Sequence, residues 1–239
     1  MDERVMDDLT LDPSPPGGLR EQNRTERRAR IREAARTVFC RRGYQDATTR
    51  EIAALAGVAH ATLFRYASDK RELLLLIVND DLDDLATQRW RDPPRRPGRS
   101  LREQIMELYR PRYEYFARYP LLSRPFVSEA FRFMGVRPSE VGPEARRNRA
   151  RRAELIAELQ RMFEQVPGRA RRGTEAREFA ALVHAIYLTA NCIWLESPTL
   201  DPAAGLRTLD QHLRLAARGF DRSLRAGPRR QGARPKDDR

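Results

Sequence analysis

The sequence predicts an all-α protein with a three-helix N-terminal domain followed by a C-terminal helical bundle. Three observations support this. Apolar residues recur with helical spacing through most of the chain, capping signals separate short segments near the N-terminus, and no alternating β-branched run bounded by turns occurs. Stretches rich in Pro and Gly mark an arm over 1–22, a basic tail over 223–239 and a break at 91–100 between two helical stretches. We expect a first domain over 23–84, whose last helix links onward, and a second domain over 85–222. We expect the arm and the tail to be disordered.

Composition excludes several classes of protein. The 239 residues carry a formal net charge of +12, which is modest support for a polyanionic partner. The longest aliphatic run, Leu73–Val78, is far shorter than the roughly 20 residues of a membrane-spanning helix. The acidic N-terminus lacks the apolar region of a secretory signal, so we expect a cytoplasmic protein with no membrane partner. Cys40 and Cys192 lie in apolar helical patterns and are expected to be buried free thiols.

The first predicted helix runs from about Thr25 to Arg42. Its apolar stripe is spaced i, i+4, i+7 and i+8, with arginines on the other faces. Gly43 follows two arginines, which is typical of a helix C-terminus because cations and then glycine suit that end. The stripe consists of Ile31, Ala35, Val38 and Phe39.

Two short helices follow. The sequence Thr48-Thr49-Arg50-Glu51 has the pattern of a capping box, in which the first and fourth residues bond each other's backbone N–H groups. Gly57 ends that helix, and a second short helix is predicted over about 60–66. Between Arg20 and Lys70 the chain has twelve basic and six acidic residues.

Two short helices joined by a Gly-centred turn in a basic block predict a helix-turn-helix, whose second helix enters the major groove of DNA. In this arrangement Val58 and Leu63 would point into the core, while His60 and Thr62 would point outward. Asp69-Lys70-Arg71-Glu72 is a second capping box that opens a long helix. This helix is apolar on all sides over 73–78, which predicts that other elements cover it on several sides.

The wider block GYQDATTREIAALAGVAHATLFRYASDKRELL, at 43–74, is preceded by IREAARTVFCRR. Together they resemble the N-terminal domain of the TetR family of transcriptional regulators over about residues 24–84. The resemblance implies a three-helix DNA-binding domain, a C-terminal ligand domain, and a homodimer that leaves double-stranded DNA when a small molecule binds.

The resemblance also implies which residues contact DNA. Arg50 would reach a base edge, His60 and Ala61 would lie at base-reading positions, and Lys70 would meet a phosphate at a helix N-terminus. Each polar residue among them could instead be a solvated surface residue. Phe64 stands where the family usually has a tyrosine, which removes one phosphate hydrogen bond, and Ala59 and Ala67 replace a usual serine cap and a core phenylalanine. The expected DNA-binding set is Thr48, Thr49, Arg50, His60, Ala61, Thr62, Phe64, Tyr66 and Lys70.

The C-terminal part is predicted to contain an aromatic-rich helix after Ser100, a segment over 121–135, an Arg-rich helix over 143–166, and a final pair over 174–195 and 202–222. The resemblance implies that this final pair forms a four-helix dimer interface with its mate. Its apolar stripes would suit the monomer core equally well. They consist of Phe179, Val183, Ile186 and Ala190, and of Leu206, Leu209, Leu213 and Ala217.

A ligand site is expected among the aromatic residues of this part. His184, Tyr187 and Asn191 share one helical face and could supply the few polar groups that an apolar pocket uses. An apolar or aromatic effector is expected because no charge partner is obvious, although the same residues could simply be core. The expected ligand-binding set is Tyr113, Phe116, Phe131, Met134, His184, Tyr187, Asn191 and Trp194.

The sequence therefore favours a ligand-responsive, homodimeric regulator, most readily a repressor released from an inverted-repeat operator. An activator is the alternative within this class, and a sequence-nonspecific DNA-coating protein is the alternative outside it. An enzyme is disfavoured because no phosphate loop, GxSxG, HExxH or paired catalytic carboxylates occur. Scattered histidines and two distant cysteines show no metal-ligand spacing, and no cofactor is expected.

Overall fold

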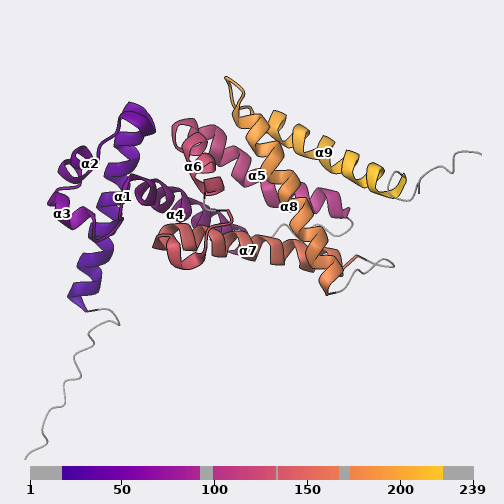
Figure 1. The fold of residues 1–239 in the computed structure, drawn as a ribbon, viewed down its shortest axis with the longest axis horizontal. Coiled ribbons are helices and arrows are strands. Elements are labelled where there is room, and N and C mark those ends of the chain that lie inside the picture. Colours follow the sequence, from indigo (N-terminus) through magenta and orange to yellow (C-terminus); the bar gives the residue numbers. More distant parts are fainter. Residues whose placement is uncertain (1–17, 92–98, 133, 167–172, 223–239) are drawn as a thin grey trace, which may run out of the picture. The chain divides into compact units, whose positions relative to one another are not determined.

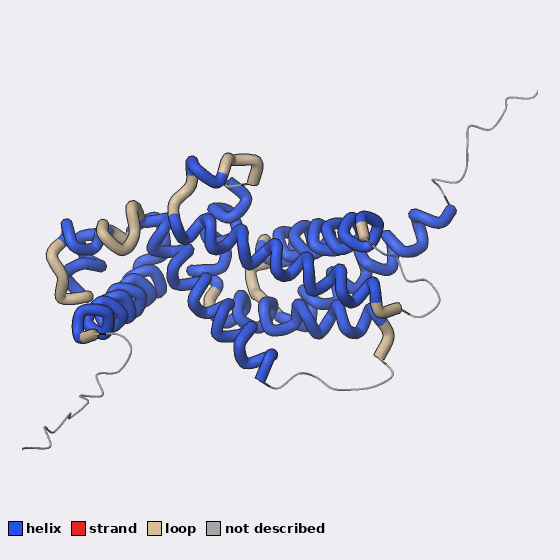
Figure 2. The backbone as a smooth tube through the Cα atoms, turned by 90° about the horizontal axis from the view of Figure 1, so that it is seen from below, coloured by secondary structure: helices blue, strands red, loops and turns tan. Residues whose placement is uncertain are grey.

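The computed structural model describes residues 18–91, 99–132, 134–166 and 173–222. All regular elements in these ranges are helices, which confirms the all-α fold class (Figures 1 and 2). The chain forms two compact units that divide between Ile77 and Val78, within helix α4. We call them the N-terminal unit and the C-terminal unit.

The N-terminal unit contains α1 (Leu19–Asp46), α2 (Thr49–Leu55), α3 (His60–Leu63) and the start of α4 (Lys70–Arg91). The C-terminal unit contains the rest of α4 and the helices that follow it. These are α5 (Leu101–Arg118), α6 (Pro120–Arg132), the 3₁₀ turn η1 (Pro138–Glu140), α7 (Pro143–Glu164), α8 (Thr174–Leu195) and α9 (Pro202–Arg222).

Helix α1 begins earlier than predicted. It starts at Leu19 instead of about Thr25, so residues 19–22 of the predicted arm are helical, while residues 1–17 lie outside the described ranges. No helix breaker follows Gly18, and an ion pair joins Glu21 to Arg24 at 3.6 Å, one turn apart. The helical geometry breaks at Gly43, where φ is +78°, as its position predicted, and one further turn follows.

The first predicted capping box is complete, and one of the two bonds of the second is present. The Thr48 hydroxyl accepts the Glu51 N–H at 3.2 Å, and the Glu51 carboxylate accepts the Thr48 N–H at 3.3 Å, so the first capping box is confirmed. The Asp69 carboxylate accepts the Glu72 N–H at 2.9 Å at the start of α4. Helix α3 begins at His60 as predicted but has only four residues, because the chain turns from Phe64 to Tyr66.

The predicted burial of both cysteines is wrong, although both are free thiols. Cys40 is exposed because it follows the buried Phe39 by one residue and so points about 100° away from the apolar stripe of α1. Cys192 is half-buried on α8. In the helix-turn-helix, Leu63 is buried as predicted, whereas Val58, His60 and Thr62 are all half-buried.

Helices α5 and α8 lie at the centre of the packing in the C-terminal unit. Helix α8 packs against α7 and α9, and α5 packs against α6, α7 and α9 (Figure 1). Helices α8 and α9 have the predicted bounds. The predicted apolar stripes prove to be mixed: Phe179 and Ile186 are half-buried and Ala217 is exposed, while the other members are buried within the single chain. Those buried members are Val183, Ala190, Leu206, Leu209 and Leu213.

Helix α9 approaches its neighbours closely at Gly205. A Cβ atom at this position would lie 2.5 Å from Cδ1 of Tyr113 and 2.9 Å from Cδ2 of Trp194, both of which are buried. The missing side chain therefore allows α9 to lie directly on these two rings.

We expect Gly205→Ala to lower the free energy of unfolding by about 1–3 kcal/mol, because overpacking of the two rings exceeds the roughly 1 kcal/mol that alanine gains in a helix. Chemical denaturation of the variant and the parent measures this difference. Gln211→Ala, at an exposed position of α9, is the control and should change stability by less than about 0.5 kcal/mol. A Gly205→Ala protein as stable as the parent would show that the close approach is not a constraint.

Candidate functional site

The two helices of the helix-turn-helix are joined at their N-terminal ends by a side-chain hydrogen bond. Thr49 Oγ1 lies 2.9 Å from His60 Nε2. The His60 ring also packs edge-on against Phe64, with 4.8 Å between the ring centroids. His60 is therefore held between two neighbours, where the sequence predicted only that its side chain points outward.

The remaining predicted DNA contacts lie at or near the surface of the N-terminal unit. Arg50 and Ala61 are exposed, as is the Thr48 cap, whereas Tyr66 is half-buried. Phe64 is 43% exposed, so its packing covers only part of the ring. Contact of these residues with DNA stays a prediction.

Lys70 has a role inside the unit that the sequence did not reveal. Its ammonium group donates hydrogen bonds to the carbonyl oxygens of Gln45 at 2.9 Å and of Ala47 at 3.3 Å. The same group lies 4.9 Å from the centroid of the Tyr44 ring. Lys70 thus ties the end of α1 to the start of α4, in addition to the phosphate contact predicted for it.

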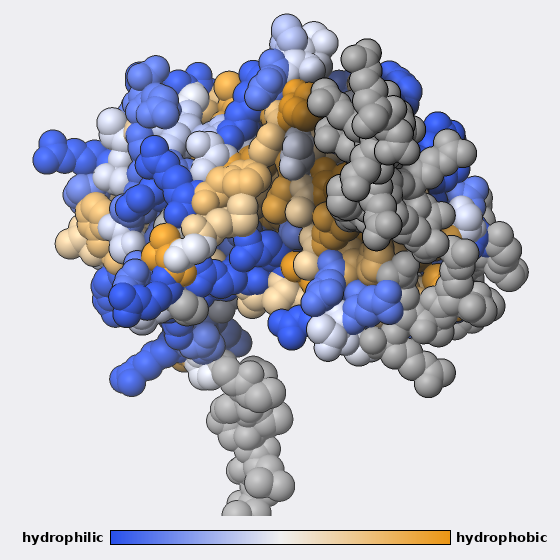
Figure 3. Space-filling view, turned by 45° about the vertical axis from the view of Figure 1, so that its right-hand side comes forward, coloured by the Kyte–Doolittle hydropathy of each residue, from blue (hydrophilic) through white to orange (hydrophobic). Residues whose placement is uncertain are grey.

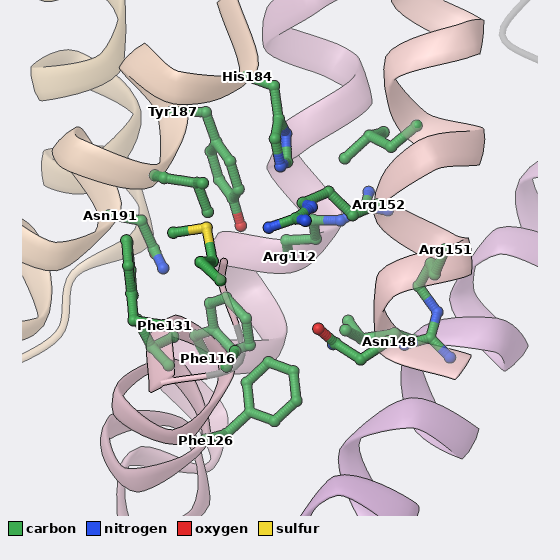
Figure 4. Close-up of a pocket in the computed structure, with 16 residues that line it drawn as sticks. Arg112, Phe116, Phe126, Phe131, Asn148, Arg151, Arg152, His184, Tyr187 and Asn191 are labelled. Carbon is green, nitrogen blue, oxygen red and sulfur yellow. The ribbon is translucent and has the colours of Figure 1, made fainter. Parts of the chain in front are cut away.

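A cavity of about 90 Å³ lies in the C-terminal unit (Figure 4). Six of the eight predicted ligand residues line it, from α5, α6, α8 and the turn after α6: Phe116, Phe131, Met134, His184, Tyr187 and Asn191. The other two lie outside the lining. Tyr113 and Trp194 pack against each other with 5.0 Å between their centroids, and Trp194 Nε1 donates to the Asp201 carbonyl oxygen at 2.9 Å.

The expectation that the lining offers no charge partner is wrong. Arg112 of α5 and Arg151 and Arg152 of α7 line the cavity, as does Asn148. Sequence reasoning missed them because α7 has arginines on several faces, and a charged helix face is usually solvated. Nothing local marks which arginines point inward.

His184 is the buried titratable group of the cavity. Its Nδ1 atom lies 3.1 Å from the Tyr109 hydroxyl, whereas its Nε2 atom has no hydrogen-bond partner among the described residues. Burial, together with the positive charges of Arg152 and Arg112, lowers the pKa of His184 from 6.5 to about 4. The imidazole is therefore neutral at pH 7.

Arg151 connects the cavity wall to α4. Its Nε atom donates to Asp83 Oδ1 at 2.6 Å, Nη1 donates to Asn79 Oδ1 at 2.6 Å, and Nη2 donates to the Asn79 carbonyl oxygen at 2.8 Å. Arg147, one turn earlier on α7, donates to Asp80 Oδ1 at 2.5 Å and also pairs with Asp83. Asn79 Nδ2 donates to the side chain and the backbone oxygen of Glu144, both at 2.9 Å.

Comparison with known proteins agrees with this architecture. Residues 31–77 match the sequence pattern of the family described as bacterial regulatory proteins, tetR family. The N-terminal part of the chain is therefore similar to the TetR family of transcriptional regulators, as the sequence indicated. The HTH-type transcriptional activator FasR of Mycolicibacterium smegmatis is 41% identical over 76 residues, which make up 30% of this chain and only 35% of FasR.

Solved structures match over most of the chain. The TetR-family repressor FadR of Thermus thermophilus, crystallised with lauroyl-CoA, is 25% identical, with a TM-score of 0.60, and the match covers 86% of this chain and all of that one. A TetR regulator from Rhodococcus sp. RHA1 is 21% identical, also with a TM-score of 0.60, over 81% of this chain and 97% of that one.

Helix α8 is apolar enough to pass a test for a membrane span. Over the described residues it is the one helix with the required length and hydropathy, and 44% of its most apolar window is buried in the fold. Core helices of soluble proteins pass the same test, so this is weak support for a membrane span. No cluster of three potential metal ligands occurs in the described ranges.

The lowered pKa of His184 predicts how stability depends on pH. The unfolded chain binds a proton at this residue near pH 6.5 and the folded chain only near pH 4, so stability is lost as the pH falls through that window. We expect the parent to lose about 3 kcal/mol more than His184→Gln between pH 7 and pH 4. Urea unfolding of both proteins across this range measures the difference. Parallel curves would mean that the folded protein accepts the proton at the ordinary pKa.

Proposed function

We propose that this chain is a homodimeric regulator that binds an inverted-repeat operator through α2 and α3 and is released when a small molecule occupies the cavity of the C-terminal unit. The observation that carries the proposal is the capped, basic helix-turn-helix in the N-terminal unit, which shares one chain with a cavity lined by α4–α8. A sensor needs both a DNA-reading element and a ligand site.

Three features support DNA binding by the N-terminal unit. It is rich in arginine, the side chain best suited to bidentate contacts with guanine, and Arg50 is exposed near the N-terminus of α2. The bond between Thr49 and His60 fixes the two helices relative to each other. The third is the similarity to FasR, a transcriptional activator, which is 41% identical over 76 residues.

An exposed apolar face on α8 supports the homodimer. Ala181, Ala185, Thr189 and Ile193 follow each other at intervals of four residues, and all are exposed in the single chain. Ile193 is 48% exposed, and the nearby helix α9 also exposes Leu215. Figure 3 shows that apolar surface reaches the exterior between hydrophilic residues on the face in view. Small residues allow two helices to approach closely. In a two-fold symmetric dimer, this face of α8 would pack against the same face of a second copy.

The cavity supports an effector with an apolar part, because phenylalanines and Met134 form much of its lining. FadR of Thermus thermophilus, which is a repressor, was crystallised with lauroyl-CoA and shares this fold. We propose that the chain is likewise a repressor whose effector loosens DNA binding. The alternative is an activator like FasR, because the sign depends on the position of the operator relative to the promoter.

The operator contact is tested by selecting bound fragments from the source genome and then measuring affinity for the selected site. We expect an inverted repeat that is preferred about 10³-fold or more over unrelated DNA, whereas a DNA-coating protein would show little preference. Arg50→Ala should relax the preference at particular positions by about 1–3 kcal/mol. Arg177→Ala, at an exposed site on α8, is the control and should leave the preference unchanged. Unchanged preference in Arg50→Ala would assign Arg50 to the solvated surface.

The dimer is tested by placing a charge on the exposed face of α8. Ile193→Glu should convert the protein to a monomer at micromolar concentration, because burying an unpaired carboxylate opposes association. Leu121→Glu makes the same kind of change at a leucine of α6 that is 46% exposed, and it should leave the dimer intact. Light scattering measures whether each variant is a monomer or a dimer. A parent that is monomeric with and without DNA, or an Ile193→Glu dimer as tight as the parent's, contradicts this interface.

A further inference from the structure

Two arginines of the cavity have no acidic partner among the residues that the structure describes. Arg112 Nη1 donates to the Leu108 carbonyl oxygen of its own helix at 3.2 Å, and no hydrogen bond or ion pair joins Arg152 to any residue that the structure describes. Arg151 differs because Asp83 pairs with it. The lining includes no aspartate or glutamate among the described residues. The cavity therefore carries positive charge that this part of the chain does not neutralise.

Burial makes this charge unfavourable. Partial burial, and then the nearby Arg149, lower the pKa of Arg152, while burial, and then the charges of Arg152 and Arg112, lower the pKa of His184. Such shifts occur where cations lie in a poorly solvated and positive environment. A bound anion would remove the mismatch, whereas a neutral ligand would desolvate the arginines further without pairing them.

Two buried polar atoms of α8 also lack partners. His184 is 6% exposed, and its Nε2 atom has no hydrogen-bond partner among the described residues. Asn191 is 1% exposed, and its Oδ1 atom likewise accepts no hydrogen bond from them. If the Tyr109 hydroxyl donates to Nδ1, then Nε2 carries the proton of the neutral ring and is a free donor. A buried donor without an acceptor costs about 1–3 kcal/mol, which a ligand oxygen would recover.

His184, Arg112 and Arg152 lie apart from the phenylalanine rings within the cavity. Figure 4 shows the His184 ring directed toward Arg112 and Arg152 on one side, and the rings of Phe116, Phe126 and Phe131 gathered on another. A ligand that satisfies both groups must have a charged end and an apolar end.

We propose, on the basis of the function proposed above, that the effector is an amphiphile with an anionic head group, a carboxylate or a phosphate, held by Arg112, Arg152 and His184. Its apolar part lies against the phenylalanine rings. Because the cavity of about 90 Å³ is small beside the 300–1,000 Å³ of sites for drug-sized ligands, a longer apolar part displaces Met134, which is 38% exposed. This inference corrects the sequence-based expectation of an effector without a charge partner.

The test uses the full chain and three probes with the same ten-carbon chain: decanoate, decyl phosphate and the neutral decanol. Calorimetry should show that at least one anionic probe binds at least about tenfold more tightly than decanol. The ratio between decanoate and decyl phosphate identifies which anionic head the site prefers. Equal affinity for all three probes, or no binding of any, overturns the proposal.

Variants assign the preference to the cavity arginines. Arg112→Gln and Arg152→Gln should each reduce the preference for the anion to less than about threefold, while Arg152→Lys should retain most of it. Arg161→Gln, at an exposed position of α7 outside the lining, should behave like the parent. Thermal unfolding shows whether each variant is folded, and Arg152→Lys is informative even if Arg152→Gln is not. Preference that survives in both Gln variants overturns the assignment.

Operator binding is measured on the same samples. A parent that discriminates its operator but shows no preference for the anionic probes overturns the head-group inference alone. A parent that binds DNA without sequence preference overturns the proposed function itself, whatever the probes do.

Discussion

Arg151 is a cation buried inside the C-terminal unit, and helix α4 supplies the groups that pair with its charge. Its guanidinium group donates to Asp83 and to Asn79, both of which lie on α4. Removing either partner would leave a buried charge or a buried polar group without a partner, which costs several kcal/mol. Because α4 and α7 must keep the register that brings these groups together, the position of α4 against α7 is fixed by hydrogen bonds as well as by apolar packing.

The same guanidinium also lines the cavity, and this gives the proposed effector a physical route to α4. Leu82, a neighbour of Asp83 on α4, belongs to the lining as well. A ligand shifts an equilibrium only if it binds one of two states more tightly. A head group held by Arg152 would lie beside Arg151, the next residue of α7, whose charge is paired by Asp83 of α4. Helix α4 continues into the N-terminal unit through Lys70–Ile77. The residues that would sense the ligand are therefore covalently continuous with those that follow the helix-turn-helix.

Prediction from the sequence succeeded where the signal is local. The capping box at Thr48, the break at Gly43 and the bounds of α8 and α9 depend on residues a few positions apart. The sequence could not show that Arg151 points inward, because its partners lie 68 and 72 positions away on α4. Nor could it separate core aromatics from cavity aromatics. Tyr113 and Trp194 lie outside the lining because α9 packs on them at Gly205, a close approach that only the fold creates.

Helix α8 combines three surfaces, which explains why its sequence is apolar almost all round. One surface lines the cavity with His184, Tyr187 and Asn191, and a second is buried within the single chain at residues such as Ala180 and Ala190. The third is the exposed face that ends at Ile193. A helix that is apolar on every side is normally covered on every side. The exposed face of α8 is therefore the surface that a second copy of the chain would cover in the proposed dimer. In the proposed dimer one rigid helix would then carry both the ligand contacts and the subunit contacts. A change in the cavity would reach the interface without any additional moving part.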